Sequence, residues 1–394
     1  MANNNENKIL NVPNLRFPEF SGEWKKMKVS ELLDFYSTNS LSWEQLDYNN
    51  GKIKNLHYGL IHKGVPTMVD VACDYLPYIK EESMPKSFTL FKEGDVAFAD
   101  ASEDTNDVAK AIEVVNCDNQ QIVSGLHTIH GRDNSNQTII GYKGYAFASD
   151  SFHKQIRRIA QGTKVFSIST RNFDEVYIGI PSKEEQTKIA KLLIAIDKRI
   201  ATQTKIIEDL KKLKSAISHI LFSSKGAIHL SEIANVVMGQ SPSSNAYNDQ
   251  GLGMPLVQGN LDISNGKTTP RLYTAEFNQT TEKGNIILTV RAPVGEVAKA
   301  TQKVCLGRGV CAIIPHEENM SDFIYQYLTF YKFMWRRYEQ GSTFTSINGS
   351  DVRNIFCPKV RNVSILTLLD IKINIEEREV KQYQSQKQYM LYQM

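Results

Sequence analysis

The sequence of 394 residues lacks any long apolar run, so it contains no candidate membrane span. A helix that crosses a bilayer needs about 20 consecutive apolar residues. The densest apolar cluster here is the short run Leu192-Leu193-Ile194-Ala195-Ile196. Residues 1–7 are polar and lack the cationic and apolar regions of a secretion signal. These absences predict a cytoplasmic protein with no membrane-embedded part.

Cysteine is scarce, and its spacing suits neither disulfides nor zinc. The chain has five cysteines, an odd number, and no Cys-x-x-Cys pair. A structural zinc site needs four closely spaced Cys and His ligands, and the sequence offers no such group. The pattern therefore predicts reduced thiols and no metal site. The cysteines are Cys73, Cys117, Cys305, Cys311 and Cys357.

Familiar catalytic motifs are also missing. Gly266-Lys267-Thr268 resembles the end of a phosphate-binding loop, but Leu261 stands where that loop needs a glycine, so a turn is favoured. There is no Gly-x-Ser-x-Gly and no His-Glu-x-x-His. The Asn/Asp-Pro-Pro-aromatic run of amino-group DNA methyltransferases is absent too. The sequence favours a non-catalytic protein, with an enzyme of unfamiliar site as an alternative.

The charges nearly balance. The chain has 46 Lys and Arg against 43 Asp and Glu, a net charge of +3. Positive charge is concentrated in residues 183–225, which hold ten Lys and Arg and five Asp and Glu. The remainder of the chain is close to neutral or negative, so the composition does not predict a surface that binds any polyanion.

An internal repeat organises the chain, with a period near 175 residues. The segment Arg157-Arg158-Ile159-Ala160-Gln161-Gly162-Thr163 recurs 179 residues later as Arg336-Arg337-Tyr338-Glu339-Gln340-Gly341-Ser342. Upstream, Lys92-Glu93-Gly94-Asp95-Val96 parallels Glu282-Lys283-Gly284-Asn285-Ile286. The repeat indicates two copies of one globular unit, each followed by another element.

A long helix is predicted after the first copy. Residues 183–223 contain neither Gly nor Pro, and apolar side chains recur at spacings of three and four, which is typical of a coiled-coil seam. About 40 residues form a helix of about 60 Å, which needs a partner along its length. Gln203 and Lys214 interrupt the seam. Its apolar members are Ile189, Leu193, Ile196, Ile200, Ile207, Leu210, Ile217 and Leu221.

A matching seam near the C-terminus supplies the partner, with Glu376 and Lys387 at the two polar positions. Polar seam residues fix register and partner choice in coiled coils. A two-fold relation between the copies would make the helices antiparallel, and Gln203 could then face Lys387 rather than Glu376. Parallel packing, or two unrelated amphipathic helices, are the alternatives. The apolar members are Leu366, Leu369, Ile373, Val380, Tyr383, Met390 and Met394.

The predicted fold class is α+β, with two pseudo-symmetric heads joined by long helices that pair as an antiparallel coiled coil. The heads are residues 1–181 and 226–358, and the helical segments are 182–225 and 359–394. One helix is expected before each Gln-Gly pair, at 149–159 and 320–338, with Gly162 and Gly341 as left-handed helix stops. Strands are expected at 95–99, 138–140, 165–168, 176–178, 285–290 and 309–314.

Recognition is expected in the polar loops of the heads, at 43–64, 130–144 and 239–273. For any single cation a solvated surface charge is the simpler explanation. The recurring Arg-Arg pairs could grip phosphates or cap a helix. The candidate DNA-binding residues are Lys63, Arg132, Lys143, Arg157, Arg158, Ser243, Lys267, Arg271, Arg291, Arg308, Arg336 and Arg337.

The arrangement resembles the specificity subunit of type I restriction–modification systems. The resemblance rests on the duplicated head, on the Arg-Arg…Gln-Gly segment, and on Ile180-Pro181-Ser182-Lys183-Glu184-Glu185-Gln186-Thr187-Lys188-Ile189-Ala190. The run Gly239-Gln240-Ser241-Pro242-Ser243 is similar to the loop that opens many target-recognition domains of that family. These features extend over essentially the whole chain.

The resemblance implies a non-catalytic DNA-recognition subunit. Each head would be a target-recognition domain for one half of a bipartite, asymmetric site in double-stranded DNA, and the helices would fix the gap. Two methylation subunits carrying S-adenosylmethionine would dock on the helices, and restriction subunits would carry ATP and Mg²⁺. Two readers on a rigid spacer suit half-sites about 34–36 Å apart. The alternative is a coiled-coil adaptor or structural protein that does not bind DNA.

The second helical segment departs from the family pattern. Residues 358–363 lack the Glu-Gln of the first copy, and the segment is about four residues short before the seam. We therefore expect a diverged or truncated second spacer helix, with weaker docking of one methylation subunit as a consequence.

Overall fold

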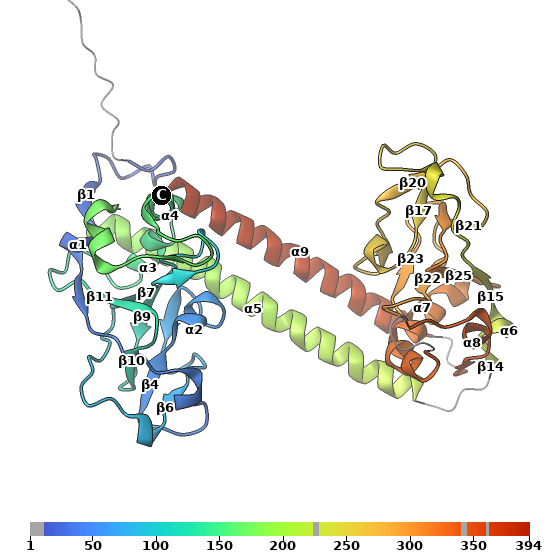
Figure 1. Ribbon diagram of the computed structural model, residues 1–394, viewed down its shortest axis with the longest axis horizontal. Coiled ribbons are helices and arrows are strands. Elements are labelled where there is room, and N and C mark those ends of the chain that lie inside the picture. Colours follow the sequence, from blue (N-terminus) through green and yellow to red (C-terminus); the bar gives the residue numbers. More distant parts are fainter. Residues whose placement is uncertain (1–11, 224–227, 340–344, 360–361) are drawn as a thin grey trace, which may run out of the picture. The chain divides into compact units, whose positions relative to one another are not determined.

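The structure is a computed structural model that describes residues 12–223, 228–339, 345–359 and 362–394. By its internal contacts the chain divides into two compact units (Figure 1). Unit 1 comprises residues 1–202 together with 379–394, and unit 2 comprises residues 203–378. Each long helix is thus shared between the units, whereas the sequence-based boundaries at 181, 225 and 358 separate heads from helices.

Unit 1 is built on two mixed sheets. In the larger sheet only the pair β9 (Ala111–Asn116) and β5 (Met68–Asp70) is parallel, and in the smaller one only the pair β10 (Gln121–Ser124) and β4 (Ile53–Leu56) is parallel. The larger sheet has the order β2 (Asp34–Tyr36), β11 (Thr128–Arg132), β7 (Val96–Ala99), β9 (Ala111–Asn116), β5 (Met68–Asp70). The smaller sheet has the order β10 (Gln121–Ser124), β4 (Ile53–Leu56), β6 (Tyr78–Ile79), β3 (Leu46–Asp47).

Strand β7 explains why a continuous apolar run forms a strand here. Successive side chains of a strand point to opposite faces. Val96 and Phe98 pack into one hydrophobic cluster, and Ala97 and Ala99 pack into another on the other face. All four residues are buried, so β7 is covered on both faces and needs no polar alternation.

The remaining elements of unit 1 surround these sheets. Two short ribbons pair β1 (Lys25–Lys28) with β13 (Tyr177–Ile180) and β8 (Ala101–Ser102) with β12 (Phe166–Ser167). The helices are α1 (Val29–Leu32), α2 (Tyr58–His62), α3 (Lys143–Phe147) and α4 (Asp150–Ile159). Three 3₁₀ helices are η1 (Trp43–Gln45), η2 (Glu81–Ser83) and η3 (Thr170–Glu175).

The helix predicted at 149–159 is confirmed as α4, and Ser149 caps it by accepting a hydrogen bond from the Phe152 N–H. The strand predicted at 138–140 is wrong: this segment is a turn before α3, and the Ile139 N–H bonds to the Gln186 side chain rather than to a neighbouring strand. Gly162 has a positive φ of 143°, but α4 has already ended at extended Ala160. Gly162 instead serves the turn that pairs Gln161 with Ser167. The other predicted stop, Gly341, lies outside the described residues.

Unit 2 repeats this topology and adds one edge strand to each sheet. Its parallel pairs are β23 (Val297–Lys299) with β19 (Lys267–Thr268) and β24 (Val304–Leu306) with β17 (Met254–Val257). Its larger sheet has the order β15 (Ala234–Met238), β25 (Val310–Pro315), β22 (Ile286–Thr289), β23 (Val297–Lys299), β19 (Lys267–Thr268), β18 (Ile263–Ser264). Its smaller sheet has the order β16 (Tyr247–Asn248), β20 (Leu272–Thr274), β17 (Met254–Val257), β24 (Val304–Leu306), β21 (Thr280–Thr281). A ribbon pairs β14 (Ile228–His229) with β26 (Phe356–Cys357).

The helix predicted at 320–338 is only partly correct. Helix α7 covers Ser321–Tyr331, and the chain then tightens into the 3₁₀ helix η7 (Lys332–Arg337). The tighter turn places Trp335 in the core, fully buried, with its ring 5.1 Å from that of Tyr331. The other helices are α6 (Leu230–Ile233) and α8 (Gly349–Arg353), with 3₁₀ helices η4 (Ser244–Ala246), η5 (Asn260–Asp262) and η6 (Glu318–Met320).

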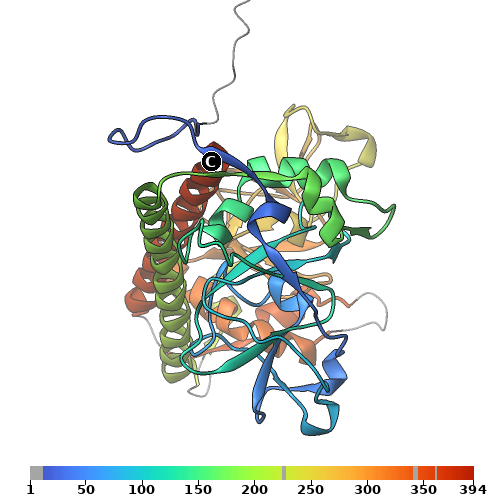
Figure 2. The ribbon, with the colours of Figure 1, turned by 90° about the vertical axis from the view of Figure 1, so that its left-hand side faces the viewer.

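The two predicted long helices are present as α5 (Lys183–Phe222) and α9 (Ser364–Gln393). In each unit one half of α5 lies beside one half of α9 in antiparallel orientation. In unit 1, Leu193 packs with Leu391 and Asp197 pairs with Lys387. The ribbons of α5 and α9 can be followed in Figure 2. In unit 2, Lys214 pairs with Asp370. Every predicted seam residue is buried or half-buried, which confirms the helical pairing.

The polar seam residues meet differently from the suggested Gln203–Lys387 pair. The Gln203 amide donates to the buried carboxylate of Glu376. The Lys214 and Lys387 ammonium groups each lie 2.6 Å from a carboxylate, that of Asp370 and Asp197 respectively. Lysine and aspartate reach each other because the helices are antiparallel and the positions are staggered. The same ion pair therefore occurs once in each unit.

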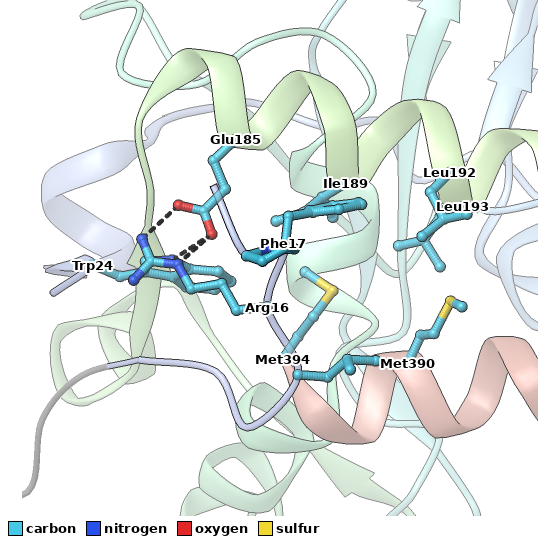
Figure 3. A pocket seen from close by; sticks show the side chains of 11 residues that line it. Arg16, Phe17, Trp24, Glu185, Ile189, Leu192, Leu193, Met390 and Met394 are labelled. Atoms are coloured by element: carbon cyan, nitrogen blue, oxygen red, sulfur yellow. Dashed lines mark hydrogen bonds and ion pairs between the residues drawn. The ribbon is translucent and has the colours of Figure 1, made fainter. Parts of the chain in front are cut away.

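Helix α5 begins on a set of contacts that involve the Glu-Gln pair. Glu185 is buried and accepts hydrogen bonds from Arg16 and Trp24, as Figure 3 shows for the arginine. Gln186, also buried, accepts from the Ile139 N–H and donates to the Pro181 carbonyl. Beside Glu185, Met390 and Met394 of the C-terminal segment line an apolar cavity of about 200 Å³.

Helix α9 has 30 residues against 40 in α5. The predicted shortening is therefore present, and it lies at the start of the helix. In the repeat, Ser364 corresponds to a position within α5 well after Lys183, whereas the ends of the two helices nearly match. Val363 and Leu366 are buried at this start, so apolar packing takes the place of the Glu185 and Gln186 contacts.

Candidate DNA interface

Unit 2 has a polar cleft of about 550 Å³ at the point where several strands end. Strands β15, β17, β22 and β24 all finish beside it. The cleft brings together Arg291 and Arg308, two of the sequence-predicted candidates. Its other lining residues are Ser241, Pro242, Ser244, Tyr247, Gln258, Gly259, Ala292 and Gly309.

Close backbone approach shapes this cleft. A Cβ on Gly239 would lie 2.1 Å from the Gly307 carbonyl oxygen, and one on Gly309 would lie 2.1 Å from the Gln258 carbonyl oxygen. Only glycine fits at such approaches. The Arg308 N–H donates to Ser241 Oγ at 3.0 Å, which fixes the loop after β15 against the β24–β25 turn. The predicted recognition loop thus forms one wall of the cleft.

The cleft is cationic. Arg291 and Arg308 are both exposed, and within the described ranges no carboxylate lies within ion-pair distance of either guanidinium. Ser243, another predicted residue, is exposed between two lining residues. Guanidinium groups with hydroxyl and amide neighbours are the side chains that contact DNA phosphates and base edges. The arrangement therefore suits a nucleic acid.

Unit 1 has a cluster of rings at its own strand ends. The Trp43 and His57 ring centroids are 4.2 Å apart, those of His57 and Tyr58 are 4.7 Å apart, and those of Tyr58 and His127 are 5.3 Å apart. Trp43 is 45% exposed and His127 is also exposed, so the cluster reaches the surface. Asp100 lies beside it, 3.1 Å from His127 Nδ1.

The protonation of the inner ring is set by its surroundings. Burial lowers the pKa of His57 to about 4, and repulsion from His127 acts in the same direction. His57 is therefore neutral at pH 7, and its Nδ1 accepts a hydrogen bond from the Gly59 N–H at 3.1 Å. Burial raises the pKa of Asp100, although the neighbouring His127 opposes the shift.

Two predicted candidates are corrected, because they belong to the interior of unit 1. Arg132 forms hydrogen bonds of 2.7 and 2.6 Å with the buried carboxylate of Asp95. Lys143 is 3% exposed, and its ammonium lies 3.2 Å from the fully buried carboxylate of Glu113. Both cations neutralise interior carboxylates, so neither offers its charge to DNA.

The other candidates are distributed over the surface. Arg157 is half-buried, bonds to Asn106 at 3.2 Å and lies 3.6 Å from Asp150. The Arg271 guanidinium is 3.1 Å from a carboxylate oxygen of Asp262. Exposed candidates without an ion pair to a described residue are Lys63, Arg158, Lys267, Arg336 and Arg337. Whether any of these touches DNA stays a prediction.

The sequence analysis missed the individual members of the ring cluster. Trp43 and His57 fall within the polar loop predicted for recognition, but His127 lies far along the chain and its contact with Tyr58 depends on the fold. No sequence signal marked His127: its positive φ of 53°, in the turn between β10 and β11, is a property of the folded chain.

Two further features of the described residues concern membrane spans and metal ligands. None of the described helices is long and apolar enough to cross a membrane. Within the residues that the structure describes, no three His, Cys, Asp or Glu side chains gather as metal ligands would. All five cysteines are free thiols.

Comparisons with known proteins agree on one family. The chain is 27% identical over 409 aligned positions to a protein from Methanocaldococcus jannaschii, provisionally named as type I restriction enzyme MjaX specificity subunit, with 95% of this chain and 93% of that protein covered. The crystal structure of a type I restriction–modification S subunit from M. genitalium is 19% identical, with a TM-score of 0.63 and coverage of 97% and 98%.

A second solved chain comes from work on complex assembly and conformational transition of a type I restriction–modification system. It is 20% identical, with a TM-score of 0.57 and coverage of 93% and 96%. At such identities the two structures establish the fold. The family described as type I restriction modification DNA specificity domain matches residues 21–212 and 226–382. With both halves matched over most of its length, the chain belongs to the specificity subunits of type I restriction–modification systems.

Proposed function

We propose that each unit reads one half of a bipartite, asymmetric site in double-stranded DNA, and that the chain itself is not catalytic. The observation that carries this proposal is the repeated topology. The strand order of unit 1, with its parallel pairs, recurs in unit 2, which adds the edge strands β18 and β21, while the side chains at the strand ends differ. Two equivalent scaffolds with different surface chemistry suit two different half-sites.

Helices α5 and α9 are proposed to fix the gap between the half-sites. Their seam is closed by apolar packing and by the Asp197–Lys387 and Lys214–Asp370 pairs. Polar seam contacts hold one register, and a helix pair in one register is a spacer of constant length. A constant spacer is what a fixed number of unspecified base pairs requires.

The outer surfaces of the helices are proposed to dock methylation subunits. In unit 2, Ile206, Leu213 and Ile220 follow one another at heptad spacing and are 38%, 49% and 80% exposed. On α9, Leu368 and Ile375 are 62% and 37% exposed. Exposed apolar stripes mark protein interaction sites. We place S-adenosylmethionine in these partners, and ATP with Mg²⁺ in restriction subunits.

Exchange of one head tests the proposal. Residues 25–180 are replaced by the corresponding segment of a family member with a known site, and the complex with its methylation subunits is assayed by footprinting on DNA. We expect one half-site to change and the other to remain. An exchange that alters both halves together, or a wild-type complex that protects no preferred sequence, would contradict the proposal.

A further inference from the structure

The unit 2 cleft and the unit 1 ring cluster occupy the same place in the repeat. Equivalent backbone contacts establish this. Gly307 N–H bonds to Val257 O as Gly125 N–H bonds to Leu56 O, at 2.8 and 3.0 Å. The hydrogen bond from Val290 N–H to Gly309 O in unit 2 corresponds to the one from Asp100 N–H to His127 O in unit 1. The hydrogen bond from Gln240 N–H to Leu306 O corresponds to the one from Asn39 N–H to Ser124 O. The bridge between Arg291 and Ser346 corresponds to the strand pairing of Ala101 with Ser167.

These contacts align the two sites residue by residue. The 3₁₀ helices η4 and η1 follow the same loop, so Ser244 corresponds to Trp43. The other correspondences, unit 2 first, are Gln258 with His57, Gly259 with Tyr58, Arg291 with Ala101, Arg308 with Leu126 and Gly309 with His127.

At the aligned positions, unit 2 has small residues and an open cleft, whereas unit 1 has aromatic rings that fill the corresponding space. Unit 2 has Ser244, Gly259 and Gly309 where unit 1 has three rings. Small residues leave room for the cleft of about 550 Å³ in unit 2. In unit 1, the rings of Trp43 and Tyr58 pack in tilted contacts on either side of the buried His57 ring, with centroids 4.2 and 4.7 Å from it.

Charge is also distributed in opposite ways. Both cationic positions of the cleft are occupied by uncharged residues in unit 1, Ala101 and Leu126. Asp100 lies beside the unit 1 cluster, 3.1 Å from His127 Nδ1. The two cations that line the unit 2 cleft therefore attract an anionic ligand group more strongly than the equivalent positions of unit 1 do.

We propose that the unit 2 cleft binds a DNA phosphate through Arg291 and Arg308, and that the equivalent surface of unit 1 contacts DNA through its rings, without ionic contacts. This inference rests on the proposed function. It implies that the contribution of the unit 2 cleft to DNA affinity depends on salt concentration, whereas the contribution of the unit 1 ring cluster does not. Each phosphate neutralised by a cation releases counterions, so its contribution weakens as salt rises. Ring contacts release none.

The test is the salt dependence of binding to a duplex that carries the site modified by the complex. Each lost phosphate contact reduces the slope of log affinity against log salt by about 0.9. Arg291→Ala with Arg308→Ala removes the proposed phosphate contact and should therefore lower the slope by about 0.9, so that raising salt from about 50 to about 200 mM costs the variant roughly threefold less affinity than wild type. Trp43→Ala should weaken binding at every salt concentration and leave the slope unchanged.

Lys283→Ala is the matched control, because it removes an exposed cation at the other end of β22 from the cleft. We expect it to leave the slope within error of wild type. An equal loss of slope in this control, or an unchanged slope in the double arginine variant, overturns the inference. Relaxed preference at a single base with an unchanged slope also overturns it, because that result indicates a base contact. If the wild-type complex still binds its site sequence-specifically, any of these results overturns only the inference about the cleft and leaves the proposed function intact. A wild-type complex without sequence preference overturns both the inference and the proposed function.

Discussion

Asp95 lies in the interior of unit 1, where several partners hold its carboxylate. Arg132 and His130 contact it at 2.6 to 2.7 Å, and the Lys92 N–H donates to it at 2.8 Å. Arg132 also stacks on the Tyr36 ring, 4.7 Å from its centroid. Because the carboxylate is 1% exposed, water cannot replace a partner that is removed.

Replacement of Arg132 by Ala should destabilise unit 1 by about 3–5 kcal/mol, because it leaves a buried carboxylate without its cation. The free energy of unfolding can be measured with urea, following the fluorescence of Trp24 and Trp43, which both belong to unit 1. Arg158→Ala, at an exposed site, is the control and should change stability by less than about 0.5 kcal/mol. Equal effects of the two substitutions would argue against the structural role of Arg132.

The same variant should show a pH dependence. Burial alone would raise the pKa of Asp95, but hydrogen bonds from His130 and Arg132 lower it below its ordinary value. A carboxyl group with a lowered native pKa stabilises the fold above its unfolded pKa of about 4, and this contribution is lost as pH falls through the native pKa. The stability difference between wild type and Arg132→Ala should therefore narrow below about pH 4. A difference that widens in acid contradicts this assignment.

At the scale of elements, the ion pairs between α5 and α9 hold the register of the seam. Lys214→Glu places like charges together and should destabilise unit 2 by roughly 1 kcal/mol. Adding Asp370→Lys should restore most of the loss, since the Gln326 amide that now donates to Asp370 can turn its oxygen to the new lysine. Thermal unfolding of the single and double variants measures the coupling. Additive losses would mean that these residues do not interact.

The exposed stripe on α5 is a separate element-scale feature. Ile206→Ser, Leu213→Ser and Ile220→Ser together should abolish co-purification with a methylation subunit, because they remove the apolar surface proposed for docking. Circular dichroism should show unchanged helix content, since the seam residues Ile207 and Leu210 are retained. A triple variant that still binds its partner with wild-type affinity would exclude this surface.

The long helices could be predicted from apolar spacing within one segment of the sequence. The role of each charged side chain could not, because it depends on residues that are distant in the sequence. The heptad spacing from Ile189 to Leu221 is contained in one segment, so it indicated the seam correctly. Burial of Arg132 and Lys143 requires Asp95 and Glu113, which come from distant segments of the chain, and no local signal reveals those pairs. For the same reason Arg291 and Arg308 were named as candidates, but their meeting in one cleft follows only from the fold.

For the whole molecule, the length of the helices should determine the gap in the DNA site. One heptad inserted in α5 and one at the matching level of α9 would lengthen the spacer by about 10.5 Å. At about 3.4 Å per base pair, the unspecified gap should grow by about three base pairs, with the specified bases unchanged. Footprints of the lengthened and wild-type complexes measure the gap. Unchanged spacing would show that the helices do not set it.

In the proposed function, two different DNA-recognition units act from one chain at a fixed separation. The most direct measurement is a map of the positions modified on genomic DNA by the complex that contains this chain. We predict a motif of two specified parts separated by an unspecified gap of constant length. A single uninterrupted motif, a gap of variable length, or modification that does not depend on this chain would contradict the claim.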